Sequence, residues 1–243
     1  MKTAAKTKKS VSLDDRVKAV VTKLKRLSTK STLDGMARYG LPSDNALGVS
    51  IAAIQKVAKE IGRDHDLAEA LWATGIYEAR LLAAFVDEPE KVTPAQMDRW
   101  CRGFDNWGVV DTVCFKLFDQ TPHAWKKVGQ WASRRDEFQK RAGFVLLACL
   151  CGHDKTASND RFLECLPLIE GAATDERNFV KKGLSWALRG IGRRNLELNK
   201  AAAELAGRLS KSSDPTARWL GKEALREFAR PVVVNQLRKK KKT

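Results

Sequence analysis

The sequence predicts an all-α protein. Apolar residues recur at helical spacing in segments that begin about every 15–20 residues, as expected of short packed helices. Runs that alternate apolar and polar residues between turn pairs, which would predict strands, are nearly absent. In chain order, the predicted helices span residues 13–28, 32–39, 46–61, 64–73, 77–86, 94–103, 105–118, 121–132, 136–150, 160–170, 176–192, 195–210 and 214–229.

Cap and turn residues support several of these boundaries. A proline follows Thr93, Thr121 and Asp214, and proline is favoured at the first position of a helix behind such a cap. Gly190 and Gly192 are predicted to end the helix over 176–192, because glycine terminates helices readily. The same glycines also fit a phosphate-binding hairpin between two helices, a weaker alternative.

Short linkers between these helices define the expected architecture. Taken in pairs, the helices form units of about 35–40 residues, close to the length of HEAT and armadillo repeats. We therefore expect an α-solenoid, a right-handed superhelical stack of HEAT-like helix pairs with a concave surface suited to an elongated ligand. Residues 13–230 are predicted to form a single repeat domain, flanked by a basic disordered N-terminal arm (1–12) and a basic C-terminal tail (231–243).

The charge distribution indicates the ligand. The chain has 45 Lys and Arg against 29 Asp and Glu, and residues 121–243 alone carry 26 basic and 13 acidic side chains. These cations lie within helical patterns and alternate with tryptophans, which favours a basic groove that binds nucleic acid. An anionic membrane surface or an acidic protein remains the alternative.

Membrane insertion and secretion are not expected. No apolar run approaches the ~18–20 residues that span a bilayer. The basic N-terminal residues are not followed by an apolar segment of the signal-peptide kind.

Cysteine and histidine patterns do not predict a metal site. The five cysteines lie in helical patterns, and Cys149 and Cys151 form a CxC pair without a second pair. The three histidines are outside HxE and HExxH patterns. We therefore expect reduced core thiols in a cytosolic protein, with no metal and no cofactor.

One carboxylate falls on an apolar helix face. Phe104, Trp107, Asp111, Cys114 and Phe118 share one stripe at helical spacing. An isolated Asp in such a place most often caps a helix or pairs with a neighbouring cation. Alternatively, because Trp107 precedes it by one turn, the stripe faces a ligand instead of the core.

Cations stand in similarly unusual places further along the chain. Lys182, Arg189 and Arg193 lie at i−4, i+3 and i+7 from Trp186, a cationic stripe around one aromatic that is suited to a nucleic-acid strand. Arg141 lies beside the apolar face of its predicted helix. Such an arginine either pairs with a carboxylate or phosphate or extends to solvent.

These segments resemble the DNA alkylation repair glycosylases of the AlkD type, which are built from HEAT-like repeats. By itself the W-x-x-x-D element is weakly specific, but the order and separation of the segments make the resemblance fairly strong over residues 34–229. The matching segments are MARYG (36–40), LAEALWATGIYEARLLAAFV (67–86), WGVVD (107–111), KRAGFVLLACL (140–150) and KKGLSWALRG (181–190).

The resemblance implies roles for five residues. Trp107 and Trp186 would stabilise an oxocarbenium-like sugar through cation–π attraction. Asp111 would add electrostatic stabilisation and position or deprotonate the attacking water. Arg141 would hold a flanking phosphate, and Tyr39 would contact the DNA backbone.

The implied activity is a monofunctional DNA N-glycosylase of base excision repair. Its substrates would be positively charged N3- and N7-alkylated purines in double-stranded DNA, without a Schiff-base lysine, a cofactor or a base-reading pocket. We expect a cytoplasmic monomer that joins the nucleoid on DNA. Asn106 and Gly108 stand where the family often has an aromatic and an acidic residue, so substrate range or rate is expected to differ.

Two other functions remain open. Relatives bind branched or distorted DNA without excising a base, and a non-catalytic protein of this kind is the main alternative. A HEAT-type scaffold for protein partners is the third, and it would favour apolar anchors in the groove over cationic stripes. A pure DNA binder has no need of the Asp111 carboxylate, whose charge opposes phosphate binding.

Overall fold

The computed structural model of the chain describes residues 11–41 and 44–240. All regular structure in these residues is helical. The chain divides into two compact units, one ending at Glu88 and the other beginning at Pro89, and the single repeat domain over 13–230 stays a prediction. Residues 1–10 of the expected N-terminal arm lie outside the described residues; Ser12 accepts a hydrogen bond from the Asp15 amide and caps the first helix.

The first unit packs its helices around aliphatic side chains. α5 contacts both α3 and α4, and α1 packs on α4. Leu67, Leu71, Leu81 and Leu82 are fully or almost fully buried between them. The helices are α1 (Leu13–Arg26), α2 (Lys30–Arg38), α3 (Ile51–Ile61), α4 (His65–Ala73) and α5 (Tyr77–Val86).

A buried carboxylate fixes the segment before α3. Glu78 is 0% exposed, and its two oxygens accept hydrogen bonds from the amides of Leu47, Gly48 and Val49 at 2.8, 2.7 and 3.1 Å. α3 begins at Ile51 and not at residue 46 as predicted, because Gly48 lies outside the right-handed helical region and the Ser50 side chain caps the helix by accepting from the Ala53 amide. Gly48 has φ +79°, and a Cβ there would meet the Thr29 carbonyl oxygen at 2.8 Å.

Glu78→Gln is expected to lower the free energy of unfolding by roughly 2–3 kcal/mol, because a charged acceptor is replaced by an amide that offers one oxygen to three donors. Chemical denaturation of the full chain measures the change. Glu60→Gln, which removes an exposed carboxylate of the same unit, is the matched control and should behave like the wild type. Equal stability of the two variants would contradict this assignment.

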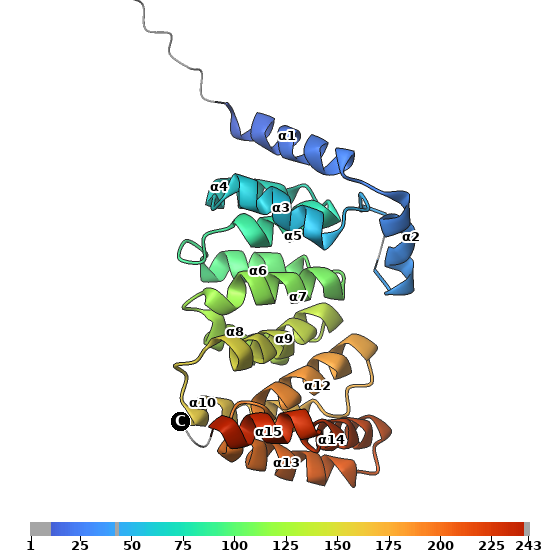
Figure 1. The fold of residues 1–243 in the computed structure, drawn as a ribbon, viewed down its shortest axis with the longest axis vertical. Helices are drawn as coiled ribbons and strands as arrows, with labels where there is room; N and C mark the ends of the chain where they lie inside the picture. The colour runs from blue at the N-terminus through green and yellow to red at the C-terminus, as the bar shows by residue number, and fades with distance from the viewer. Residues whose placement is uncertain (1–10, 42–43, 241–243) are drawn as a thin grey trace, which may run out of the picture. The chain divides into compact units, whose positions relative to one another are not determined.

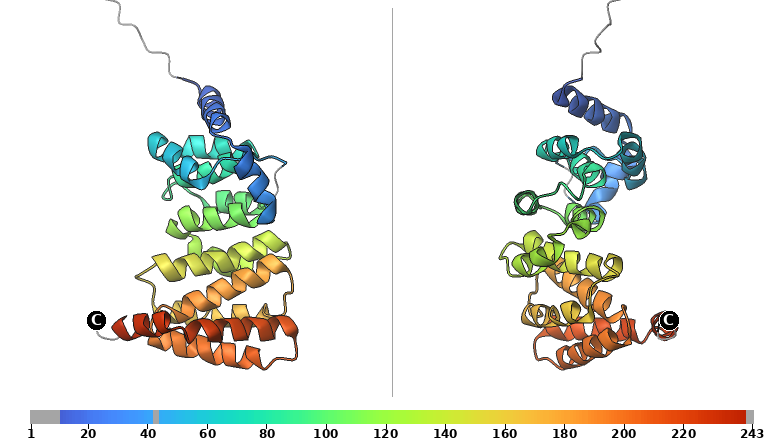
Figure 2. Two further views of the ribbon diagram at one scale, coloured as in Figure 1. Left: turned by 45° about the vertical axis from the view of Figure 1, so that its right-hand side comes forward. Right: turned by 90° about the vertical axis from the view of Figure 1, so that its left-hand side faces the viewer.

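The second unit is built around one long buried helix. α9 packs against α7, α8 and α12, and its residues 141–151 are all buried. Within this unit, Figures 1 and 2 show α6 and α7 in one layer, α8 and α9 in the next, and α12, α13 and α14 beyond. The helices are α6 (Pro94–Arg102), α7 (Trp107–Lys116), the short η1 (Phe118–Gln120), α8 (Ala124–Ala132), α9 (Glu137–His153), α10 (Asn159–Leu163), α11 (Leu166–Gly171), α12 (Asn178–Gly192), α13 (Leu196–Ser210), α14 (Pro215–Phe228) and α15 (Pro231–Lys240).

Two predicted helices of this unit differ from the structure. The helix expected over 160–170 is split, because Pro167 cannot donate to the carbonyl of Leu163, where α10 ends. Thr121 does not cap α8; its hydroxyl donates to the Phe118 carbonyl at 2.8 Å and the helix begins at Ala124. The predicted caps Thr93 and Asp214 are present, and α12 ends at Gly192 as expected.

The expected C-terminal tail is largely helical. Residues 231–240 form α15, which contacts α14, and residues 241–243 lie outside the described part of the chain. Val233 and Leu237, one turn apart, are 0% and 3% exposed. This short apolar stripe holds residues 231–240 of the basic C-terminal tail onto the unit as a helix.

Candidate active site

α7 presents Trp107 and Asp111 one turn apart on the same face. The helix begins at Trp107 because the Asn106 side chain accepts a hydrogen bond from the Val109 amide at 2.9 Å. Asn106 is 2% exposed and Gly108 is buried. The two departures from the family pattern are therefore a helix cap and a buried position, while Trp107 and Asp111 remain half-buried.

Asp111 is held by Arg141 of α9 in a bidentate ion pair. Arg141 Nε donates to Asp111 Oδ1 at 3.0 Å and Arg141 Nη2 to Asp111 Oδ2 at 2.8 Å. Arg141 is 5% exposed, whereas the Asp111 side chain retains 21% of its accessible surface. The sequence left open whether Asp111 pairs with a neighbour or faces a ligand; it pairs, and one side of it stays open.

Arg141 also fixes the start of α12. Its Nη1 donates to the Phe179 carbonyl at 2.7 Å, while Glu137 accepts from the Phe179 amide at 3.1 Å. Nε and both terminal nitrogens of Arg141 are thus engaged within the protein, which leaves little of the guanidinium for the flanking phosphate that the family resemblance implied. Through these contacts Arg141 joins α7, α9 and α12.

The environment of Asp111 has opposing effects on its acidity. Burial raises the pKa of Asp111, and the charge and hydrogen bonds of Arg141 act to lower it. The carboxylate therefore titrates above its ordinary range. Its charged form is the one that matches the bidentate arginine.

A second ion cluster secures the loop before α12. Asp175 accepts hydrogen bonds from Arg177 and Lys140, the residue before Arg141, at 2.6 and 2.8 Å. The hydrogen bonds of Arg177 and then those of Lys140 hold the pKa of Asp175 well below its ordinary value. The loop that leads to Phe179 is tied to α9 in this way.

Because the folded-state pKa of Asp175 is depressed, its contribution to stability is present above the unfolded-state pKa of about 3.9 and is lost as pH falls below it. Asp175→Asn is therefore expected to reduce stability at pH 7 and to flatten its dependence on pH below about 4. Urea unfolding at a series of pH values tests this. A variant with the wild-type pH dependence would exclude Asp175 as a source of acid sensitivity.

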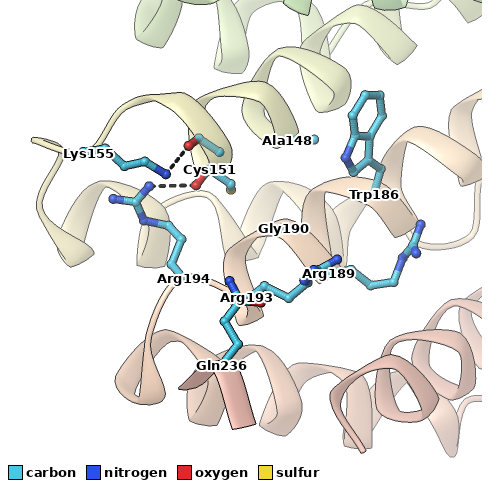
Figure 3. A pocket seen from close by; sticks show the side chains of 10 residues that line it. Ala148, Cys151, Lys155, Trp186, Arg189, Gly190, Arg193, Arg194 and Gln236 are labelled. Atoms are coloured by element: carbon cyan, nitrogen blue, oxygen red, sulfur yellow. Dashed lines mark hydrogen bonds between the residues drawn. The ribbon is translucent and has the colours of Figure 1, made fainter. Parts of the chain in front are cut away.

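The cationic stripe of α12 lies at a pocket of about 430 Å³ (Figure 3). Trp186 is half-buried in the wall of this pocket, Lys182 is exposed one turn earlier, and Arg189 and Arg193 follow. Arg189 Nε donates to the Ser185 carbonyl at 3.0 Å, and Arg193 pairs with Glu227 at 3.3 Å. The lining residues are Ala148, Cys151, Gly152, Lys155, Trp186, Arg189, Gly190, Arg193, Arg194 and Gln236.

Tyr39 belongs to the first unit. It follows α2 and is 69% exposed beside a smaller pocket of about 270 Å³ that also contains Met36, Val49 and Tyr77. Asp111, Arg141 and Trp107 lie in the second unit with Trp186. The expected contact of Tyr39 with the DNA backbone therefore stays a prediction.

The geometry adds residues and roles that the sequence did not assign. Phe179 contributes through its backbone, which leaves no side-chain signature. Asn106 could be recognised from its place before a helix, since Asn is a strong N-cap residue. Gln236 lies in the segment that was predicted to be a tail.

The cysteines and other candidate ligands do not form a metal centre. All five cysteines are buried and unbridged, and burial raises the pKa of Cys165 to about 11 and that of Cys101 to about 12. Over residues 11–41 and 44–240, no three His, Cys, Asp or Glu side chains are grouped to hold a metal ion. No helix in the same residues is long and apolar enough to cross a membrane.

The fold and site define an all-α, HEAT-like repeat protein. A solved structure with 22% sequence identity and a TM-score of 0.73 covers 86% of this chain and 94% of its own. It is described as "a new family of proteins related to the HEAT-like repeat DNA glycosylases with affinity for branched DNA structures". This similarity confirms the predicted HEAT-like fold.

The family follows from the sequence match. The pattern of the DNA alkylation repair enzyme family matches residues 20–228, and the chain belongs to that family. A comparison with curated proteins found no match.

Proposed function

We propose that the protein is a monofunctional DNA N-glycosylase that removes positively charged N3- and N7-alkylated purines from double-stranded DNA. The observation that carries this proposal is the Asp111 carboxylate, held bidentately by a buried arginine next to Trp107 in a member of the DNA alkylation repair enzyme family. A protein that only binds DNA gains nothing from orienting a partly exposed negative charge on that face.

The reaction needs no acid for the leaving group. When the bond between C1′ and the purine nitrogen breaks, its electron pair neutralises the cationic base, and the positive charge passes to the sugar. Asp111, with the aromatic faces of Trp107 and Trp186, stabilises that charge. Water then adds to C1′, and Asp111 accepts its proton and later returns it to solvent, leaving an abasic site in an intact strand.

Arg141 supports this chemistry without contacting substrate. Its two hydrogen bonds fix the orientation of the Asp111 oxygens, and its charge acts to lower the pKa of Asp111 against the raising effect of burial, which favours the ionised form. We propose that the DNA backbone is contacted by Lys182, Arg189, Arg193 and Tyr39. The basic groove of the repeat stack is part of the same proposal.

Binding of branched DNA without excision is the second candidate. It is favoured by the similarity of the fold to the structure described above as having affinity for branched DNA. This function would use the same cations and would not need Asp111.

Counting abasic sites separates the two candidates. Methylated duplex DNA incubated with the protein should acquire alkali-labile sites, release free N7-methylguanine and N3-methyladenine, and remain uncut before alkali. A protein that produces no abasic sites above the spontaneous rate, and binds a four-way junction more tightly than the duplex, would instead support the second candidate.

A further inference from the structure

The pocket beside Trp186 is built from three parts of the second unit. Its walls come from the end of α9, the last two turns of α12, and α15. Figure 3 shows Gln236 of α15 beside the basic side chains at the end of α12, and Trp186 also lies on α12. α15 begins at Pro231, beyond the family match that ends at residue 228.

The electrostatics of the pocket favour an anion. Lys155, Arg189 and Arg193 line it, and no acidic side chain lines it among the described residues, although Glu227 pairs with Arg193 from outside the lining. The C-terminal end of a helix usually repels an anion, because its unpaired carbonyl groups carry partial negative charge. Here Arg194 donates to the carbonyls of Cys151 and Asp154 at 2.9 and 2.8 Å, which neutralises that end of α9.

The size and the aromatic wall favour more than a phosphate alone. A volume of about 430 Å³ lies in the range of small-molecule sites, roughly 300–1,000 Å³, and exceeds what one phosphate group fills. Trp186 offers an indole face, and a base can stack on an aromatic face only when it is not paired inside a duplex. Gln236 adds an amide that can donate to and accept from a base edge.

We infer that this pocket receives one unpaired nucleotide of the bound DNA, with its phosphate among Lys155, Arg189 and Arg193 and its base against Trp186. The inference deepens the proposed function, on which it rests for DNA as the ligand. The pocket thereby gives the protein a preference for DNA in which a nucleotide has left the helix.

The test compares two DNAs that differ by one nucleotide. One is a fully paired duplex, and the other is the same duplex with a single unpaired 2-aminopurine. The wild type should bind the bulged duplex about tenfold more tightly, and 2-aminopurine emission should fall on binding as the base stacks. Trp186→Ala should retain the emission.

Two variants address the pocket without touching the catalytic residues. Gln236→Ala changes no charge, and Lys155→Ala removes one. Each should lower the preference for the bulged duplex by roughly three- to tenfold. For Gln236→Ala, affinity for the paired duplex should change less than twofold. Lys200→Ala, on the exposed surface of α13, removes a charge elsewhere and should leave the preference unchanged. Matching thermal unfolding of the variants confirms that each is folded.

Equal affinity of the wild type for both DNAs, or a loss by the same factor on both in Gln236→Ala, would overturn the inference. Neither result depends on base release. A wild type that releases no alkylated base but prefers the bulged duplex through Gln236 would refute the glycosylase proposal and leave the pocket assignment intact. Release of alkylated base by a wild type that does not prefer the bulged duplex would support the glycosylase proposal and refute the pocket assignment.

Discussion

Asp111→Asn is expected to reduce the single-turnover release of N7-methylguanine by about 10²–10³-fold, the usual effect of removing a group that stabilises charge in a transition state. Asparagine keeps the shape of the side chain and an oxygen for Arg141, but it has no negative charge to stabilise the sugar cation and cannot accept a proton from water. DNA binding should be unchanged or slightly tighter, since a charge that repels phosphate is removed.

The matched control for this variant is Asp160→Asn, an exposed carboxylate on α10 in the same unit. It should release the base at the wild-type rate. Measurements at saturating protein remove differences in occupancy. If Asp160→Asn and Asp111→Asn lost the same small factor, the carboxylate of Asp111 would have no special part in the reaction.

Arg141→Ala is expected to lower the free energy of unfolding by about 3–5 kcal/mol, because it leaves a half-buried carboxylate without its partner and the Phe179 carbonyl without a donor. The large effect reflects the cost of leaving the Asp111 carboxylate unpaired and not the net contribution of the ion pair. Denaturation of the single and double variants separates this cost from the contribution of the pair. Asp111→Asn/Arg141→Ala should be more stable than the sum of the single changes predicts.

Arg141→Lys distinguishes a positioning role from a purely structural one. Lysine cannot form the bidentate pair or reach Asp111 and Phe179 together. Arg141 acts to lower the pKa of Asp111, so weakening this contact should raise that pKa further and move the acid limb of the release rate to higher pH. An unchanged pH profile in a folded Arg141→Lys variant would show that Arg141 only supports the fold.

The sequence predicted most helices because their apolar periodicity and caps are local. It failed where distant residues decide the structure. Glu78 fixes the segment before α3 through three amides that lie about thirty positions earlier in the chain, and no local pattern records this. α15 was missed because its lysine-rich end conceals two apolar residues, Val233 and Leu237, that suffice to dock it.

In the candidate site, too, the sequence predicted local features and missed contacts between distant residues. The spacing of Trp107 and Asp111 within one helix was visible in the sequence, and so was the unusual position of Arg141. The pairing of Asp111 with Arg141 was not visible, because thirty residues separate them and the spacing of each allowed several partners. The pocket at Trp186 could not be anticipated either, because Gln236 joins it only through the fold of α15.

The most direct test of the central claim is the release of free N7-methylguanine from methylated duplex DNA in a single turnover, with wild type and Asp111→Asn compared at saturating protein. The wild type should release the base well above the spontaneous rate, and the variant should lose about 10²-fold or more of this rate while its DNA binding is unchanged or slightly tighter. Release at the spontaneous rate by the wild type, or equal rates for the two proteins, would contradict the central claim.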